Sequence, residues 1–283
     1  MVAGVARVPG AALRPAELRR FAGGCSPQLV QRGKGGVMFE EMVGRPAPVP
    51  EVVPGSTPVI AFGDPLTATV ATLGINPSWR GSLTDDGSLL CGPKRRLATL
   101  GSLRAESTVS LRPDQMRSAI EECAAYFRPG RNPYHRWFDP LDEIMRAALG
   151  VSFYDHTACH LDLVQWATRP ALAELCRQAR QILLAEGLPH LERLLRHGNV
   201  RTVLLNGRQV IDNAMAGRLG ELRKTGEVRI NPHRSCSLYM GESGAVTFIG
   251  WSTNLQSSLG NWPRFSSPAL FCRKRLGRVR SSP

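Results

Sequence analysis

The stretch Thr69-Val70-Ala71-Thr72-Leu73-Gly74-Ile75-Asn76-Pro77-Ser78 decides the fold class. Its first five residues are apolar or β-branched and stop at a glycine, which predicts a short buried strand that leads into a turn. Similar runs occupy residues 203–205, which end at Asn206-Gly207, and residues 245–249, which end at Gly250, and a further strand-like run lies within 151–164. We therefore expect four short strands.

Segments with helical features separate these runs. Asp114 is suited to cap a helix over 114–126, and Asp139-Pro140 has the pattern of an N-cap and first residue for a helix over 140–149. Apolar residues recur with helical spacing over 171–196, with a predicted break near Gly187-Leu188-Pro189. Strands alternating with helices predict an α/β domain with three α/β/α layers and a central, mostly parallel four-stranded sheet.

Composition divides the chain into three regions. Residues 1–55 are rich in Gly, Pro and Arg, and the three prolines in 44–50 exclude a helix or a central strand, so we interpret 1–55 as an N-terminal arm. We place the catalytic domain at 56–270. Residues 271–283 carry five cations and no acid, which predicts a basic C-terminal tail that contacts phosphates without specificity.

The charge balance indicates the class of partner. Among the 283 residues, 36 are Lys or Arg and 23 are Asp or Glu, so the formal net charge is +13. This excess favours a polyanion, with nucleic acid as the first candidate, although an Arg-rich codon bias gives the same count. No apolar run is long enough for a transmembrane helix, and the seven cysteines are scattered without a C-x-x-C pair. We expect a cytoplasmic protein with reduced thiols and no membrane partner.

Polar residues follow each predicted strand, in 74–79, 160–163, 206–208 and 250–257. Ligands of open α/β sheets bind beyond the carboxyl ends of the strands, so these positions contain the candidate site. The sequence has no P-loop, no Rossmann glycine fingerprint, no nucleophile elbow and no zincin motif. His156 and His160 are four residues apart on a strand-like segment and do not converge there, so we expect no metal and no cofactor.

Two of these sets resemble motifs of the uracil-DNA glycosylase superfamily, in which one strand leads into Gly-x-(Asp/Asn)-Pro-x and a later strand into a (His/Asn)-Pro-Ser-x-Leu-type loop. The first stands here as Gly74-Ile75-Asn76-Pro77-Ser78, with the Asn of the mismatch-specific branch, and the second as Trp251-Ser252-Thr253-Asn254-Leu255-Gln256. Residues 161–165 occupy the place of the family's base-reading segment, and 204–207 that of a further core strand. The second motif departs from the family, because Trp251 or Ser252 replaces its catalytic His or Asn and the proline is missing.

The resemblance implies roles for three residues. Asn76 cannot accept a proton near pH 7, so it is expected to hold the attacking water through its carbonyl oxygen. Ser78 stands where strict uracil enzymes carry a Tyr that blocks C5, so it leaves room for a C5 substituent. Asp162 stands at the base-reading position, where a protonated carboxyl would accept from N4 of cytosine and donate to N3. The alternative for Asp162 is a structural ion pair with Arg169.

The other candidates form two groups. Around Asn76 and Asp162, the base pocket is expected to include Gly74, Ile75, Ser78, Trp79, His160, Trp251 and Ser252. DNA contacts are expected from Thr253, Asn254, Leu255, Gln256, Ser257, Arg131 and Arg136, with Leu255 as the apolar wedge that fills the place of a flipped base. Tyr134, Trp137 and Phe138 lie among cations, which suits either base stacking or a buried aromatic cluster.

These expectations combine into a monofunctional DNA glycosylase that flips a modified base out of double-stranded DNA and leaves an abasic site. The superfamily includes an anti-phage member that removes glucosylated hydroxymethylcytosine from phage DNA, and the residues here are similar to that combination. We therefore expect a C5-substituted cytosine as target, a monomer, and a role in antiviral defence. Two alternatives stay open: a repair enzyme for uracil or G·T and G·U mismatches, and a non-catalytic DNA-binding member of the fold.

Overall fold

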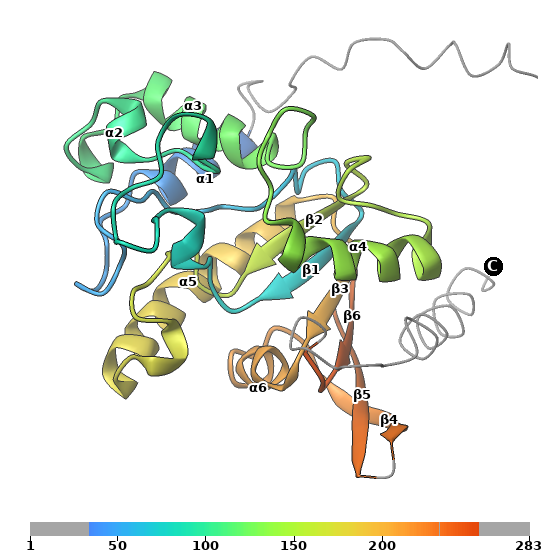
Figure 1. The fold of residues 1–283 in the computed structure, drawn as a ribbon. Helices are drawn as coiled ribbons and strands as arrows, with labels where there is room; N and C mark the ends of the chain where they lie inside the picture. The colour runs from blue at the N-terminus through green and yellow to red at the C-terminus, as the bar shows by residue number, and fades with distance from the viewer. Residues whose placement is uncertain (1–33, 232, 255–283) are drawn as a thin grey trace, which may run out of the picture.

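The computed structural model describes residues 34–231 and 233–254 (Figure 1). Its centre is a six-stranded sheet in the order β2-β1-β3-β6-β5-β4. The strands are β1 (Val70–Gly74), β2 (Ala158–Asp162), β3 (Thr202–Asn206), β4 (Arg223–Asn231), β5 (Arg234–Ser243) and β6 (Val246–Trp251). Neighbouring strands are parallel from β2 to β6, and β5 and β4 continue the sheet with antiparallel pairing. The fold is α/β, as predicted.

The prediction of a four-stranded sheet is wrong in one respect, because a hairpin of two further strands extends the parallel part. The four parallel strands are those that the apolar runs predict, and the pair β4 and β5 is additional. Most described positions of β4 are not buried, and its sequence mixes charged residues with few apolar ones. An antiparallel strand at the edge of a sheet needs no continuous apolar run, so the hairpin lacks the signal that marks buried strands.

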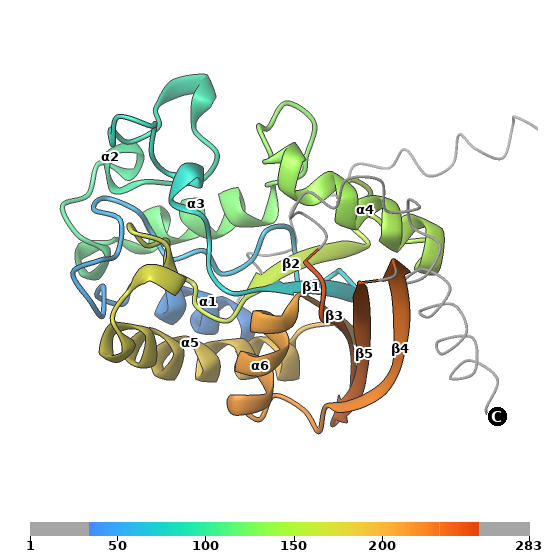
Figure 2. The same cartoon turned by 60° about the horizontal axis from the view of Figure 1, so that its bottom comes forward.

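Helices lie on both faces of this sheet. They are α1 (Lys34–Val43), α2 (Leu100–Leu103), α3 (Pro113–Ala124), α4 (His135–Leu149), α5 (Arg177–His197) and α6 (Arg208–Ala216). Figure 2 shows α4 on one side of the sheet and α5 and α6 on the other. The parallel strands are therefore covered on both faces, and every residue of β1 and of β2 is buried.

Two helices differ from the prediction at their prolines. Helix α4 begins at His135 rather than at Pro140, because Phe138 anchors the extra first turn in the core. Helix α5 runs unbroken past Gly187 and Pro189. The missing N–H of Pro189 removes one helical hydrogen bond, while burial of Leu183 before it and Leu191 after it holds both halves against the sheet.

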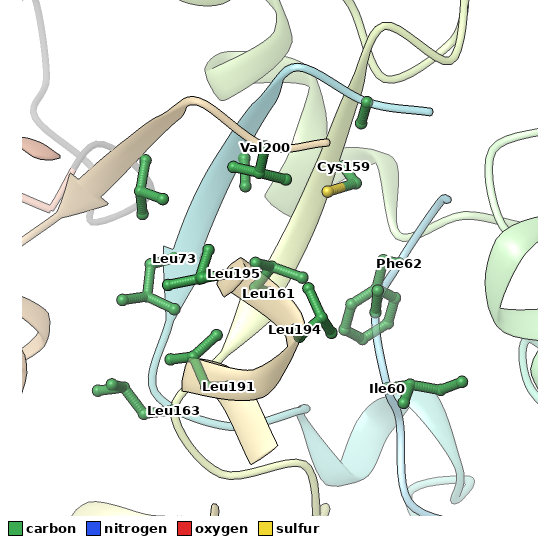
Figure 3. Packing of buried hydrophobic residues seen from close by; sticks show 14 of the residues in the cluster. Ile60, Phe62, Leu73, Cys159, Leu161, Leu163, Leu191, Leu194, Leu195 and Val200 are labelled. Carbon is green, nitrogen blue, oxygen red and sulfur yellow. The ribbon is translucent and has the colours of Figure 1, made fainter. Parts of the chain in front are cut away.

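The alternation of strand side chains separates core from site. In Figure 3, Leu191, Leu194 and Leu195 of α5 gather beside Leu73 and Leu161 of the parallel strands. Side chains next to these along β1 and β2 point to the opposite face, toward α4, because successive residues of a strand alternate. The register pairs Thr72 with His160 and Gly74 with Asp162 on that face.

The region assigned to the arm contributes to the core where it is described. The α1 residues Met38, Phe39, Met42 and Val43 are buried in the main hydrophobic cluster. Further along, the prolines of 44–50 lie outside regular helix and strand, and Val52 and Val53 are buried. The packed domain thus includes residues 34–55. The rest of the arm, Leu255, Gln256, Ser257 and the basic tail lie outside the described residues.

Candidate active site

A cavity of about 250 Å³ opens at the carboxyl ends of β1 and β2. Its aromatic lining consists of Phe62, Tyr126, Tyr134, Trp137 and Phe138. Its polar lining includes Asn76, Ser78, Arg80, His160 and Asp162. An apolar cavity with a few convergent polar groups at this edge of an α/β sheet is the usual form of a ligand site.

A second cavity of about 230 Å³ adjoins the first, because Asn76, Trp137 and His160 line both. It extends toward β3, where Asn206 and Asn254 form part of its wall. A larger cavity, of about 430 Å³, lies at the opposite edge, near the amino end of β6. None of the residues that follow the parallel strands lines that larger cavity, so the candidate site is the adjoining pair.

His160 and Asp162 form a buried pair of titratable side chains at the site. His160 Nε2 lies 3.4 Å from Asp162 Oδ1, and both side chains are almost fully buried. The other imidazole nitrogen, Nδ1, lies 2.7 Å from the Thr72 hydroxyl, so Thr72 fixes the ring from behind. Phe62 and Phe138 pack beside the ring, with centroids 5.5 and 5.2 Å away. The pair can hold or pass a proton at the cavity wall.

Gly74 is the residue that makes this arrangement possible. A Cβ on Gly74 would lie 2.4 Å from Asp162 Oδ1 and 2.9 Å from His160 Nε2. Real Cβ atoms do not approach other atoms this closely, so any other residue would displace the carboxylate or the ring. The predicted pocket residue Gly74 therefore acts by having no side chain.

Asn76 presents its amide in a defined orientation. Its Nδ2 donates to the carbonyl oxygens of Pro77 and Trp166 and to the Thr168 hydroxyl, each at 3.2 Å. Acceptors around the nitrogen identify which end of the amide is which. Within the described residues, Oδ1 accepts no hydrogen bond, and Asn76 lines the cavity. This carbonyl oxygen therefore has capacity to accept a further hydrogen bond.

The wall after Asn76 carries small side chains. Ser78, Gly81 and Ser82 all line the first cavity. Ser78 is exposed, and its Oγ accepts from the Arg80 N–H at 3.3 Å, which caps the short 3₁₀ turn Trp79–Gly81. Of the two large side chains in this turn, Arg80 lines the cavity and Trp79 does not.

The segment after β6 differs from its predicted role. Trp251 is fully buried, and its Nε1 donates to Asn206 Oδ1 at 2.8 Å. Ser252 accepts from the Ser237 N–H through its Oγ at 2.9 Å. Neither Trp251 nor Ser252 lines the two adjoining cavities. Trp251 belongs to the main hydrophobic cluster, and among the residues of this segment that the structure describes, which end at Asn254, only Asn254 lines the site.

The remaining candidates are dispersed. Trp79 lines neither cavity, although its neighbours Ser78 and Arg80 line the first one. Ile75 lines the second cavity. Arg131 and Arg136 are exposed, whereas Thr253 is buried. The alternative ion pair between Asp162 and Arg169 is absent from the described part of the chain, because Asp162 pairs with His160.

Sequence reasoning missed two members of the aromatic lining, Phe62 and Tyr126. Phe62 reaches the site because its segment pairs with β2, with Phe62 and His160 exchanging two backbone hydrogen bonds of 2.8 Å. The Tyr126 hydroxyl accepts from the Tyr134 N–H at 3.0 Å, and burial raises the pKa of Tyr126 to about 12. Neither residue belongs to a strand end or a motif, so only the tertiary fold identifies them.

Three properties of the described residues bear on other chemistries. Burial raises the pKa of the Cys123 thiol to about 12 and that of Cys159 further, which opposes thiolate formation. Among residues 34–231 and 233–254, no three His, Cys, Asp or Glu side chains are grouped as metal ligands would be. No helix in these ranges combines the length and apolar character that spanning a bilayer requires.

Neither the protein-family models nor the sequences of curated proteins match this chain.

Proposed function

We propose that this protein is a DNA glycosylase, which hydrolyses the N-glycosidic bond of a flipped base and leaves an abasic site. The observation that carries the proposal is the convergence of the Asn76 amide, the His160–Asp162 pair and five aromatic side chains on one cavity. A flat, partly polar ligand such as a nucleobase suits aromatic walls with hydrogen-bonding groups at one end. The formal net charge of +13 favours a polyanionic substrate.

The proposed reaction uses the two polar groups in different ways. The Asn76 carbonyl oxygen accepts a hydrogen bond from water and orients that water toward C1′ of the flipped nucleotide. As the C1′–N bond breaks, its electron pair stays with the base, which takes a proton from the His160–Asp162 pair. Water bonds to C1′, and the proton that it loses restores the pair. Atoms and charge therefore balance without a cofactor.

The proposed base is a cytosine with a C5 substituent. A carboxyl group at Asp162 accepts from the N4 amine of cytosine, whereas O4 of uracil would face an acceptor. The small side chains of Ser78, Gly81 and Ser82 leave room on one wall for a group on C5. Glucosylated hydroxymethylcytosine of phage DNA has both features, and its removal would serve antiviral defence.

A base-release assay tests this proposal. Duplexes carrying uracil, a G·T mismatch, 5-hydroxymethylcytosine, its glucosylated form or unmodified cytosine are incubated with the protein, and alkali then cleaves abasic sites. We expect cleavage at modified cytosine only. Cleavage confined to uracil or mismatches would replace the cytosine assignment by a repair function. Absence of cleavage with retained DNA binding would overturn catalysis in favour of a binding protein.

Two asparagine variants make the assay specific to the site. Asn76→Ala is expected to lower turnover on the order of 100-fold, because the water loses its orienting group, while DNA affinity changes little. Asn132→Ala removes an exposed amide that donates to the Lys94 carbonyl oxygen at 3.3 Å and is the matched control. Equal losses of turnover and affinity in Asn76→Ala would indicate a structural role instead.

A further inference from the structure

Two guanidinium groups lie against one indole ring beside the aromatic cavity. Arg80 Cζ is 4.4 Å and Arg169 Cζ 5.0 Å from the centroid of the Trp79 ring. Trp79 is half-buried and packs against a small apolar cluster of Val53, Leu83 and Ala167. The ring is thus anchored from the protein side and holds two cations in place through cation–π contacts.

The surrounding backbone makes room for Arg169. Gly87 has φ +91°, and a Cβ there would lie 2.6 Å from Arg169 Nη1. The Arg169 N–H also donates to the Glu51 carbonyl oxygen at 2.9 Å. Gly87, with its positive φ, therefore leaves space for the Arg169 guanidinium group. The backbone of Arg169 is held separately, by its hydrogen bond to Glu51.

These two cations have little compensation from acids. Within the described residues, Arg169 forms no ion pair, and Arg80 has only a 4.0 Å contact with Asp85, whose side chain is 95% exposed. Both arginines are exposed to solvent. Planar guanidinium groups that stacking has already oriented are well suited to bind phosphate oxygens, since less freedom is lost on binding.

The segments that carry Arg80 and Arg169 also lie next to the Asn76 amide. Arg80 belongs to the turn that directly follows Asn76-Pro77-Ser78, and Arg80 itself lines the cavity. Arg169 follows Thr168, whose hydroxyl accepts from Asn76 Nδ2 at 3.2 Å. A strand bound to the two cations would therefore be fixed relative to the carbonyl oxygen that orients water.

We propose that Arg80 and Arg169, stacked on Trp79, bind the backbone phosphates of the DNA strand whose nucleotide enters the cavity. This inference rests on the proposed function for the identity of the strand. The ligand chemistry is the phosphodiester, so the two arginines set affinity and the position of the strand but do not read the base. Trp79 is a positioning residue in this site, since it acts through the two cations.

Salt-dependent DNA binding tests the assignment. Fluorescence anisotropy with a labelled duplex that carries a tetrahydrofuran abasic analogue gives the slope of log affinity against log salt. Each phosphate contact contributes about 0.9 to that slope. We expect Arg80→Gln and Arg169→Gln each to reduce its magnitude by about 1, and the double variant by about 2. Arg223→Gln removes an equal charge on β4, where Arg223 pairs with Glu221, and should keep the wild-type slope.

Variants of Trp79 distinguish the contribution of the aromatic ring from that of the two positive charges. Trp79→Phe keeps an aromatic face and should retain the wild-type slope, whereas Trp79→Leu should weaken binding several-fold although no charge is removed. Thermal melts confirm that each variant folds. A double arginine variant with the wild-type slope, or wild-type protein that does not bind DNA, would overturn the inference. Wild-type protein that binds with these slopes but releases no base would overturn the proposed catalysis and leave the phosphate site standing.

Discussion

Gly74 and Asp162 occupy paired positions on neighbouring parallel strands, and a methyl group on Gly74 would lie 2.4 Å from the Asp162 carboxylate. The buried carboxyl group of Asp162 thus fits at its position because Gly74 has no side chain. The same missing side chain leaves space for His160, whose Nε2 would be 2.9 Å from that methyl group. Glycine is therefore required at position 74 on steric grounds, and a substitution there can test this.

Gly74→Ala is expected to abolish most of the activity while the fold persists. The added methyl group must displace Asp162 or His160, and overpacking of this kind costs about 1–3 kcal/mol of stability. Turnover in the base-release assay and urea denaturation measure the two effects. Gly101→Ala in α2 is the control, since its Cβ would meet only the Thr99 Oγ1 at 3.9 Å. Wild-type turnover in Gly74→Ala would contradict the role of this close approach.

Asp162→Asn should shift the substrate preference rather than remove activity altogether. An amide offers a donor as well as an acceptor, so it can bond to a base carbonyl that a carboxylate would repel. We therefore expect release of uracil to rise relative to that of modified cytosine, measured on the same set of duplexes. An unchanged substrate profile would mean that Asp162 does not read the base.

Asn76→Asp is expected to destabilise the protein, even though a carboxylate is the stronger base. Two of the three acceptors around Nδ2, the carbonyl oxygens of Pro77 and Trp166, would then face a carboxylate oxygen. Loss of these hydrogen bonds next to buried carbonyls costs about 1–3 kcal/mol. Urea denaturation measures this cost, with the exposed Asn132→Asp as the control. A variant as stable as wild type would show that the amide is not held as described.

The sequence predicts the parallel part of the fold well because buried strands leave continuous apolar runs. Runs that end at Gly74, Asn206 and Gly250 correspond to β1, β3 and β6. The hairpin of β4 and β5 has one exposed edge and leaves no such run. Long helices were predicted in the right places, but their ends at Pro140 and Pro189 depend on tertiary packing that local patterns do not contain.

The candidate site shows the same division. Asn76 and Asp162 were predicted because each directly follows or ends a strand, and both line the cavity. Trp251 was expected there for the same reason but its side chain is fully buried in the core. Alternation along the strands does not separate these outcomes, because the register places Trp251 opposite Asn206 and on the face of Asp162. The Trp251 ring instead packs in the core and donates to Asn206 Oδ1, and only the assembled sheet brings these two residues together.

Acid is expected to destabilise the protein through His190. Burial, with Arg45 and Arg193 nearby, lowers the pKa of His190 from 6.5 to about 4, against an opposing effect of Glu41. The unfolded chain therefore binds a proton that the folded protein does not between about pH 6.5 and 4, so stability falls as the pH falls through this window. Melting temperatures across the range should drop, and His190→Gln should flatten the dependence.

His197→Gln provides the control for this pH dependence, because His197 is exposed at the end of the same helix. An equal flattening by His197→Gln would contradict the assignment to His190. Arg45 belongs to the same buried environment, where it pairs with Glu186 at 2.6 Å and burial lowers its pKa to about 10. The packing of the segment after α1 on α5 is therefore the part of the fold that we expect acid to weaken first.

Gly187→Ala separates helix propensity from packing within α5. Propensity alone predicts that alanine stabilises a helix interior by about 1 kcal/mol relative to glycine. The structure leads to the opposite expectation, because a Cβ at Gly187 would lie 2.3 Å from the Leu163 carbonyl oxygen, which belongs to backbone that cannot easily move. We expect destabilisation of about 1–3 kcal/mol by urea denaturation. Gly36→Ala in α1, with no atom within 4 Å of its Cβ, should show the stabilisation instead. Stabilisation by both substitutions would mean that α5 does not pack as closely on the segment after β2. The segment that directly follows Asp162 would then have to lie elsewhere.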